Sequence, residues 1–167
     1  MDLYIMRHGK AGVADHSDPR DSERCLSKPG REEISLAGAW MKAREIEFST
    51  IASSPLRRAA ETASIIARAL GDPDRVTFWD ELAIGPPPGT VVQKIREIMP
   101  ENRILLVGHE PQLSSLVSLL ICSRHECNIV LKKGGIARVR FHGDPGSGEL
   151  LWLLSPGMIQ EWHSKDR

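Results

Sequence analysis

The feature of this sequence that most limits its possible folds is the alternation of short apolar segments with longer segments of helical periodicity. Short continuous apolar runs are typical of strands covered on both faces, and they occur at residues 3–6, 50–53, 76–79 and 103–107. Segments in which apolar residues recur every three or four positions lie at residues 28–46, 54–70, 90–99 and, after Pro111, up to about 121. This order predicts an α/β fold of three layers (α/β/α), with helices on both faces of a mostly parallel central sheet.

The predicted helices begin and end at ordinary capping signals. Ser27 precedes the first helix as a cap, and Ser54 with Pro55 provides a cap and first turn for the second. Near the C-terminus, apolar runs at residues 136–141 and 149–154 flank a segment rich in Gly, Asp, Pro and Ser, which predicts a late antiparallel hairpin. Neither a repeat nor a long linker divides the sequence. We therefore expect one domain over residues 1–167.

Composition limits the classes of function open to the chain. It has 167 residues, of which 41% are hydrophobic, enough to form a real core in a chain of this size. Its 22 Lys and Arg balance 22 Asp and Glu, whereas nucleic-acid-binding proteins usually carry a basic excess. No apolar run is long enough to span a membrane, and the one at the N-terminus is too short for a signal peptide. We expect a cytoplasmic protein with neither nucleic-acid nor membrane partners.

Three cysteines, an odd number, fit neither a disulfide framework nor paired CxxC motifs, so we expect reduced thiols. Cys122, His125 and Cys127 lie close together in the sequence. A zinc site, however, needs a fourth ligand of matching geometry, and none lies nearby. The sequence therefore predicts the end of a helix that runs into a polar loop, and no metal site.

Basic side chains follow three of the predicted strands, at the point where each strand ends. In open parallel sheets, ligands bind beyond the carboxyl ends of the strands. The residues that leave the three strands are Arg7-His8-Gly9, Ser54-Pro55-Leu56-Arg57-Arg58 and Gly108-His109-Glu110-Pro111. We therefore expect two histidines and up to three arginines at one edge of the sheet.

Such a set of side chains favours phosphate chemistry. Guanidinium groups donate paired hydrogen bonds that suit tetrahedral oxyanions. Neighbouring cations lower the pKa of an imidazole, so the ring stays neutral and nucleophilic at neutral pH. A neutral histidine can attack phosphorus and carry the phosphoryl group covalently. Because arginines can neutralise the phosphoryl oxygens, the sequence predicts phosphoryl transfer with neither a metal nor a cofactor.

Three ordered segments resemble the histidine phosphatase superfamily, namely LYIMRHG at 3–9, SSPLRRAAETA at 53–63 and LLVGHEP at 105–111. The sequence is most similar to the small branch of SixA-type phosphohistidine phosphatases, and matching segments at 24–30 and 134–137 extend the resemblance over nearly the whole chain. This implies a phosphoglycerate mutase-like fold. It also implies that His8 is the phosphoacceptor, that Arg7 and Arg58 bind the phosphoryl oxygens, and that His109 completes the pocket.

The resemblance also distinguishes residues around these four. Arg58, rather than Arg57, stands where the family motif places its arginine. Gly9 belongs to the first motif, and Arg24 and Ser27 match a segment that borders the pocket in the family. The resemblance therefore implies substrate-binding roles for Gly9, Arg24 and Ser27.

The sequence departs from the larger members of the superfamily, which usually carry an insertion with a glutamate as general acid and a larger cap. Here the corresponding region is a short Pro-rich loop at 85–89 without carboxylates. The imidazole of phosphohistidine can leave after protonation near neutral pH, whereas an alkoxide needs a proton from an acid. We therefore expect a metal-independent phosphohistidine phosphatase that acts on a phosphorylated protein. Glu81 and Glu110 are the candidates for a general acid.

Two alternatives stay open at this stage. A small-molecule phosphomonoesterase of the same superfamily would act on a small phosphorylated substrate with the same four residues and with Glu81 or another acid. A module that binds phosphate or a phosphoprotein without catalysis would keep the anion site, but it would be expected to have lost His8. The sequence indicates neither the physiological substrate nor the oligomeric state.

Overall fold

The computed structural model describes residues 1–12, 21–99, 103–123 and 127–165, and in these ranges it contains one six-stranded sheet. The strand order is β3-β2-β4-β1-β5-β6. Neighbouring strands among β1 to β4 pair in parallel, whereas β5 pairs antiparallel with both β1 and β6. The strands are β1 (Asp2–Arg7), β2 (Thr50–Ser53), β3 (Val76–Phe78), β4 (Arg103–Gly108), β5 (Ile136–Arg140) and β6 (Glu149–Leu154). The mostly parallel sheet and the late hairpin are thus confirmed.

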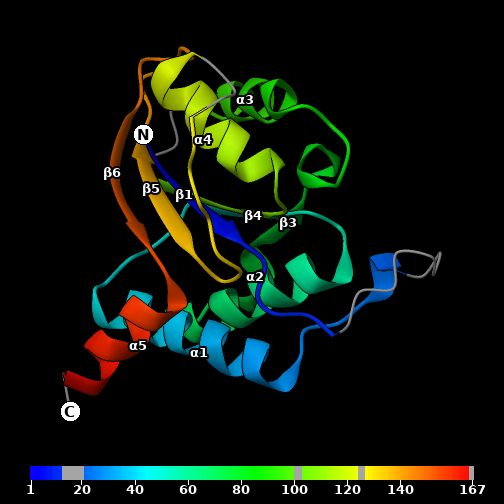
Figure 1. The fold of residues 1–167 in the computed structure, drawn as a ribbon, viewed down its shortest axis with the longest axis vertical. Coiled ribbons are helices and arrows are strands. Elements are labelled where there is room, and N and C mark those ends of the chain that lie inside the picture. Colours follow the sequence, from blue (N-terminus) through cyan, green and yellow to red (C-terminus); the bar gives the residue numbers. More distant parts are fainter. Residues whose placement is uncertain (13–20, 100–102, 124–126, 166–167) are drawn as a thin grey trace.

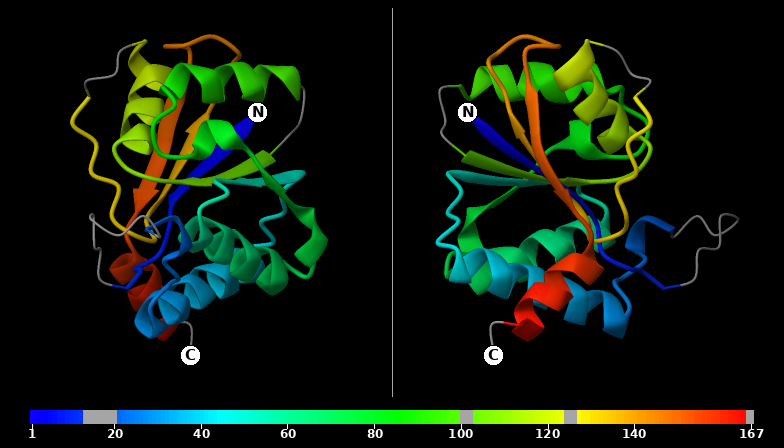
Figure 2. Two further views of the ribbon diagram at one scale, coloured as in Figure 1. Left: turned by 90° about the vertical axis from the view of Figure 1, so that its right-hand side faces the viewer. Right: turned by 60° about the vertical axis from the view of Figure 1, so that its left-hand side comes forward.

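Helices cover both faces of this sheet. Figure 1 shows α1, α2 and α5 below the sheet and α3 and α4 above it, and Figure 2 shows the same three layers from two other sides. The helices are α1 (Lys28–Ala43), α2 (Arg57–Leu70), α3 (Pro88–Glu97), α4 (Gln112–Cys122) and α5 (Pro156–Lys165), with short 3-10 turns η1 (Asp21–Glu23), η2 (Pro73–Arg75) and η3 (Asp80–Leu82). The predicted three-layer α/β/α architecture is confirmed. No helix in the described ranges is long and apolar enough to cross a membrane.

The apolar runs of the central strands supply both layers of the core. In β1, Tyr4 and Met6 pack with α1 and α2, while Leu3 and Ile5 pack on the opposite side with residues of α3 and α4. Successive side chains of a strand point to opposite faces, so a strand that is covered on both faces needs apolar residues at every position. This explains why the sequence shows runs rather than alternation at β1 and β4.

Three of the predicted helices have wrong boundaries. The first helix ends at Ala43 rather than at 46, because the chain turns at Glu45, which adopts a left-handed φ of 52°. The second begins at Arg57 rather than at Ser54, because the Ser54 hydroxyl accepts from the Leu56 N–H in a turn that precedes the helix. The third lies two residues earlier than predicted, at Pro88–Glu97. Helix α5 had no counterpart in the sequence analysis.

Candidate active site

The register of the two central strands brings His8 and His109 together. Arg7 of β1 pairs with Gly108 of β4, so each histidine is the first residue after a pair of matched strand ends. The His8 N–H extends the ladder by donating to the Gly108 carbonyl at 3.1 Å. The two imidazole rings lie with their centroids 5.1 Å apart and are tilted by 53°. They therefore share one site at the carboxyl ends of the parallel strands, where the sequence predicted it.

The next strand along the sheet delivers Arg58 to the same place. Ser53 of β2 pairs with Val107 of β4, and the Ser54 N–H donates to the Val107 carbonyl at 2.9 Å. Helix α2 then begins, and Arg58 is its second residue, with only 2% of its surface exposed. Arg57 points outward instead and pairs with Glu61 at 3.5 Å. Of the two adjacent arginines, only Arg58 is thus buried.

The hydrogen bonds of His8 fix its tautomer. Its Nδ1 lies 2.8 Å from the Gly9 carbonyl oxygen, which can only accept, so Nδ1 carries the proton and Nε2 keeps its lone pair. Burial lowers the pKa of His8 to about 4, and the positive charges of Arg58, Arg7 and Lys133 act in the same direction. At neutral pH, His8 is therefore a neutral imidazole whose Nε2 is free to attack an electrophile.

The contact with Ser54 assigns the tautomer of His109. The Ser54 hydroxyl oxygen accepts from the Leu56 N–H at 3.2 Å and lies 2.8 Å from His109 Nε2. The hydroxyl proton is thus available to Nε2, and this assignment places the ring proton of His109 on Nδ1. Burial lowers the pKa of His109 to about 3, with further lowering by His8, Arg58 and Arg7. His109 is therefore a neutral hydrogen-bond donor at neutral pH.

Three buried nitrogens around the two rings have no hydrogen-bond partner within the described part of the chain: Arg7 Nε, Arg58 Nε and His109 Nδ1. Each arginine is held by its Nη1, which donates to the Leu131 carbonyl in the case of Arg7 and to the Asp21 carbonyl in the case of Arg58. Buried donors are normally satisfied. Three unsatisfied donors around a neutral imidazole are the arrangement expected of a site that binds an oxyanion.

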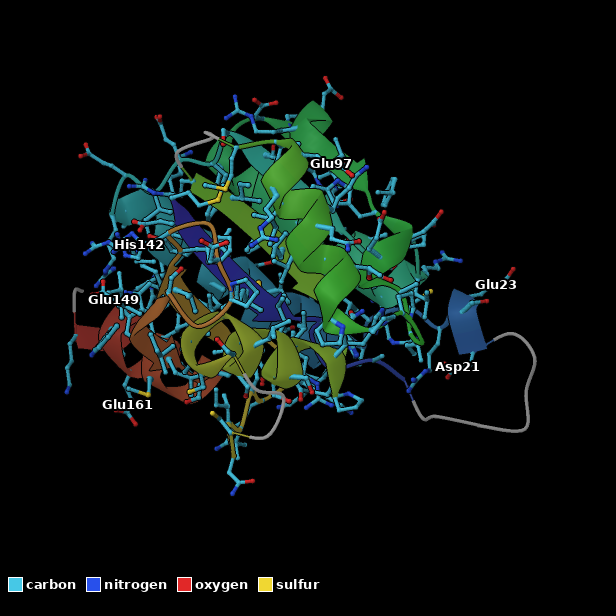
Figure 3. The ribbon with its side chains drawn as sticks, turned by 90° about the horizontal axis from the view of Figure 1, so that it is seen from above. Asp21, Glu23, Glu97, His142, Glu149 and Glu161 are labelled. Atoms are coloured by element: carbon cyan, nitrogen blue, oxygen red, sulfur yellow. The ribbon has the colours of Figure 1, made fainter. Side chains whose placement is uncertain are left out.

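Asp21, which the sequence analysis did not single out, contacts two arginines of the site. Its carboxylate lies 3.4 Å from Arg58 Nη1 and 3.0 Å from Arg24 Nε, and the Asp21 interaction raises the pKa of Arg58 against the stronger lowering by burial. Figure 3 shows Asp21 on η1, at the opposite end of the molecule from His142 and Glu149. Sequence patterns do not indicate this pairing, because η1 has neither apolar periodicity nor a predicted strand to locate it.

Thr62 is the second residue that the sequence left without a role, although it lies in the SSPLRRAAETA segment. Its hydroxyl donates to the Arg58 carbonyl at 2.7 Å and accepts from the Gly9 N–H at 3.1 Å. This buried side chain joins the loop after β1 to the first turn of α2. Thr62 therefore fixes the distance between the elements that carry His8 and Arg58.

The resemblance implied substrate-binding roles for Arg24, Ser27 and Gly9, and these three residues make different contacts in the structure. Arg24 lies close enough to His109 and Arg58 to lower the pKa of both, and its Nη1 donates to the Gly12 carbonyl. Ser27 caps α1, because its hydroxyl accepts from the Gly30 N–H and donates to the Lys10 carbonyl. Gly9 packs so tightly that a Cβ would lie 2.8 Å from Ile34 Cγ1.

The two candidate acids, Glu81 and Glu110, each contact the first residues of α4. The Glu81 carbonyl accepts from Gln112 Nε2 at 2.7 Å, so the first residue of α4 fixes the backbone of η3. The Glu110 carboxylate accepts from the N–H and the hydroxyl of Ser114 and therefore stabilises the start of α4. Neither contact reaches His8.

No group of three or more potential metal ligands occurs among the residues that the structure describes. His125 lies outside those residues. Cys122 and Cys127 lie at the end of α4 and just beyond it, away from the two histidines at the other end of that helix.

The histidine phosphatase superfamily (branch 1) matches residues 3–101. An uncharacterized protein of Picosynechococcus sp. is 32% identical over 165 residues, which cover 93% of this chain and 97% of the relative. The phosphohistidine phosphatase SixA of Escherichia coli is 28% identical over 158 residues, which cover 93% of this chain and 94% of the relative.

Solved structures point the same way. The structure of the protein histidine phosphatase SixA complexed with tungstate superposes with a TM-score of 0.83 at 28% identity, and it covers 94% of this chain and 98% of that one. The likeness thus extends over nearly the whole length of both chains, in fold as well as in sequence.

Proposed function

Because the chain belongs to the histidine phosphatase superfamily, we propose that it is a phosphohistidine phosphatase that acts on a phosphorylated protein through a covalent phosphohistidine intermediate on His8. The observation that carries this proposal is the hydrogen bond between His8 Nδ1 and the Gly9 carbonyl. It leaves Nε2 unprotonated and available as the nucleophile, and burial keeps the ring neutral.

In the first step, His8 Nε2 attacks the phosphorus of the substrate phosphohistidine, and a new P–N bond forms as the old one breaks. The released imidazole leaves as a neutral ring after it takes up a proton. In the second step, a water molecule attacks the phosphorus that is bound to His8 Nε2. The P–N bond breaks, and inorganic phosphate leaves. The net reaction converts phosphohistidine and water into histidine and phosphate, and His8 returns to its starting state.

Positive charge and hydrogen-bond donors for the phosphoryl oxygens come from the chain itself. Arg7 and Arg58 are the two guanidinium groups next to His8, and each has a buried Nε without a partner in the described residues. His109 Nδ1 is a third such donor. Donors that are already in place when charge develops stabilise a transition state without reorganisation. The tungstate bound to the related protein histidine phosphatase is a tetrahedral oxyanion of the same shape as phosphate.

Two observations favour a phosphorylated protein over a small phosphate ester. Between β3 and β4, the described residues form only η3 and α3, so no larger cap covers the site from that side. The Glu110 carboxylate, next to His109 in the sequence, accepts from the N–H and the hydroxyl of Ser114. A phosphohistidine substrate needs no strong acid, because its leaving imidazole is protonated near neutral pH.

The test is a substrate panel with matched variants. We expect the wild-type protein to hydrolyse a phosphohistidine-containing protein or peptide much faster than sugar or aryl phosphates, and the His8→Ala variant to be inactive on all of them. His142→Ala is the matched control, since His142 is exposed and pairs with Glu149 at 4.0 Å. Labelled phosphate should be trapped on the wild-type chain after an alkaline quench, because the P–N bond is acid-labile.

Two results would overturn the proposal. Faster turnover of alkyl phosphates than of phosphohistidine would make the protein a phosphomonoesterase. Binding of phosphate or tungstate without hydrolysis of any substrate would make it a binding module.

A further inference from the structure

Two thiols meet at the end of α4, outside the candidate active site. Cys122 is the last residue of α4 and is exposed, and Cys127 follows five residues later and is partly buried. Their Sγ atoms lie 3.1 Å apart. Neither belongs to a disulfide in this structure. The close approach of these two sulfurs has no role in the phosphatase mechanism.

The backbone on either side keeps the thiols together. The Ser118 hydroxyl, one helical turn before Cys122, lies 3.2 Å from the Cys127 carbonyl oxygen and 2.9 Å from the Ser114 carbonyl oxygen, and it shares its one proton between them. The Ile129 N–H donates to the same carbonyl at 2.8 Å. On the helix side, the Ser123 N–H donates to the Leu119 carbonyl at 3.1 Å and closes the last turn of α4. The chain around both cysteines is thus anchored to α4 independently of any bond between the sulfurs.

We propose that Cys122 and Cys127 form a reversible intramolecular disulfide when the protein meets a peroxide. A disulfide bond is about 2.05 Å long, so the sulfurs need to approach by only about 1 Å, which rotation about the Cα–Cβ bonds can supply. A thiol pair already in contact closes a disulfide far more readily than two thiols that must find each other by diffusion.

The chemistry balances with hydrogen peroxide as the oxidant. The more exposed thiol, Cys122, attacks one oxygen of the peroxide, which gives a sulfenic acid and one water molecule. The Cys127 thiol then attacks the sulfenic sulfur, an S–S bond forms, and the hydroxyl group leaves as a second water molecule. Two thiols and one peroxide thus become one disulfide and two water molecules. A small dithiol reverses the reaction by exchange.

Formation of the disulfide between Cys122 and Cys127 does not move the catalytic groups. The path from Cys127 to the active site runs through Leu131, whose carbonyl accepts from Arg7 Nη1. Leu131 is itself buried in the core. Since the backbone of Cys127 is already anchored to Ser118, closing the disulfide leaves Leu131 in place. Cys122 and Cys127 can therefore be oxidised without loss of phosphatase activity.

The test uses the full-length C25S variant, which removes the third thiol. We expect hydrogen peroxide at a modest molar excess to remove both remaining thiols from a thiol-reagent assay under denaturing conditions and to lower the mass by about 2 Da. Dithiothreitol should restore both thiols. Hydrolysis of phosphohistidine by the oxidised protein should stay within roughly twofold of the reduced protein.

Two further variants separate a disulfide from other oxidation products. C25S/C127S should accumulate a Cys122 sulfenic acid that dimedone traps, and this adduct should be absent from C25S. Retention of both thiols in C25S, a gain of oxygen atoms that dithiothreitol does not reverse, or cross-linked dimers as the main product would each overturn the proposal.

Discussion

His8 and His109 face each other across two neighbouring parallel strands, with ring centroids 5.1 Å apart. Their proximity follows directly from the β1–β4 register, in which Arg7 is paired with Gly108. A slip of one residue would turn the side chains of one strand to the opposite face. The apolar residues Leu3 to Met6 and Ile104 to Val107 fill both core layers and thus fix the geometry of the two histidines.

The first prediction concerns stability at acidic pH. His8 has a folded-state pKa of about 4, below its ordinary value near 6.5, so below pH 6.5 the unfolded chain binds a proton that the folded chain does not. Stability must therefore fall as the pH drops from about 6.5 to about 4. The contribution of His8 is on the order of 3 kcal/mol at the lower limit, since each pH unit corresponds to about 1.4 kcal/mol.

Denaturant unfolding at pH 7, 6, 5 and 4.5 measures this dependence, and we compare slopes rather than absolute stabilities. The slope should be shallower in His8→Ala, which lacks the titrating group. His142→Ala, a change at an exposed histidine outside the site, is the matched control. Equal slopes in all three proteins would mean that His8 titrates normally in the folded state.

The second prediction concerns the tautomer of His109. Ser54→Ala removes the hydroxyl that lies 2.8 Å from His109 Nε2, so the ring is free to place its proton on either nitrogen. One hydrogen bond contributes about 1 kcal/mol, and we expect kcat/KM for phosphohistidine to fall by roughly fivefold. Steady-state kinetics on a phosphohistidine peptide measures the change.

Ser53→Ala is the control for that variant. Ser53 is also fully buried, but its hydroxyl donates to the Ser54 carbonyl at 2.9 Å rather than to a ring nitrogen. Its kcat/KM should stay near the wild-type value even if its stability falls. Similar losses in the two variants would indicate a general packing defect at the end of β2 and no specific role for Ser54.

The third prediction concerns the charge of Asp21. Its carboxylate lies 3.4 Å from Arg58 Nη1 and would repel an anion bound to the same guanidinium. Asp21→Asn removes this charge, while the Asp21 carbonyl still accepts from Arg58. Inorganic phosphate or tungstate should therefore inhibit the variant about three- to tenfold more strongly, which corresponds to roughly 1 kcal/mol.

Inhibition constants for the two anions measure this effect. Glu23→Gln is the control, because Glu23 is exposed on the same turn as Asp21 (Figure 3) and its change alters net charge equally. Weaker inhibition of Asp21→Asn would instead identify Asp21 as the group that orients Arg58 for anion binding.

The sequence predicted the elements whose position depends on local pattern. β1 and β4 are continuous apolar runs, and their parallel pairing sets His8 beside His109 without further information. Contacts that depend on the path of a loop were not predictable in this way. Asp21 reaches Arg58 across 37 positions, and Thr62 reaches Gly9 across 53. No periodicity encodes such contacts, because both involve single polar atoms rather than a buried face.

Helix α5 escaped prediction for a different reason. Ile159 is its only buried residue among those described, so it lacks the apolar stripe by which an amphipathic helix is recognised. It is held instead by tertiary contacts. Trp162 stacks on Trp40 of α1 at a centroid distance of 6.2 Å, and the Arg44 guanidinium lies over both rings. Tertiary packing, rather than intrinsic propensity, stabilises this short helix.

The last prediction follows from this mode of attachment. Ile159→Ala removes the one side chain of α5 that is fully enclosed, with 1% of its surface exposed, and it should lower the free energy of unfolding by about 2–4 kcal/mol. Gln160→Ala, at an exposed neighbouring position, should change it by less than about 0.5 kcal/mol. Denaturant unfolding gives both values. His8 and His109 directly follow β1 and β4, and Arg58 lies on α2, so none of them belongs to α5. Folded Ile159→Ala should therefore retain wild-type turnover of phosphohistidine; a loss of turnover in a fully folded sample would show that α5 supports the site.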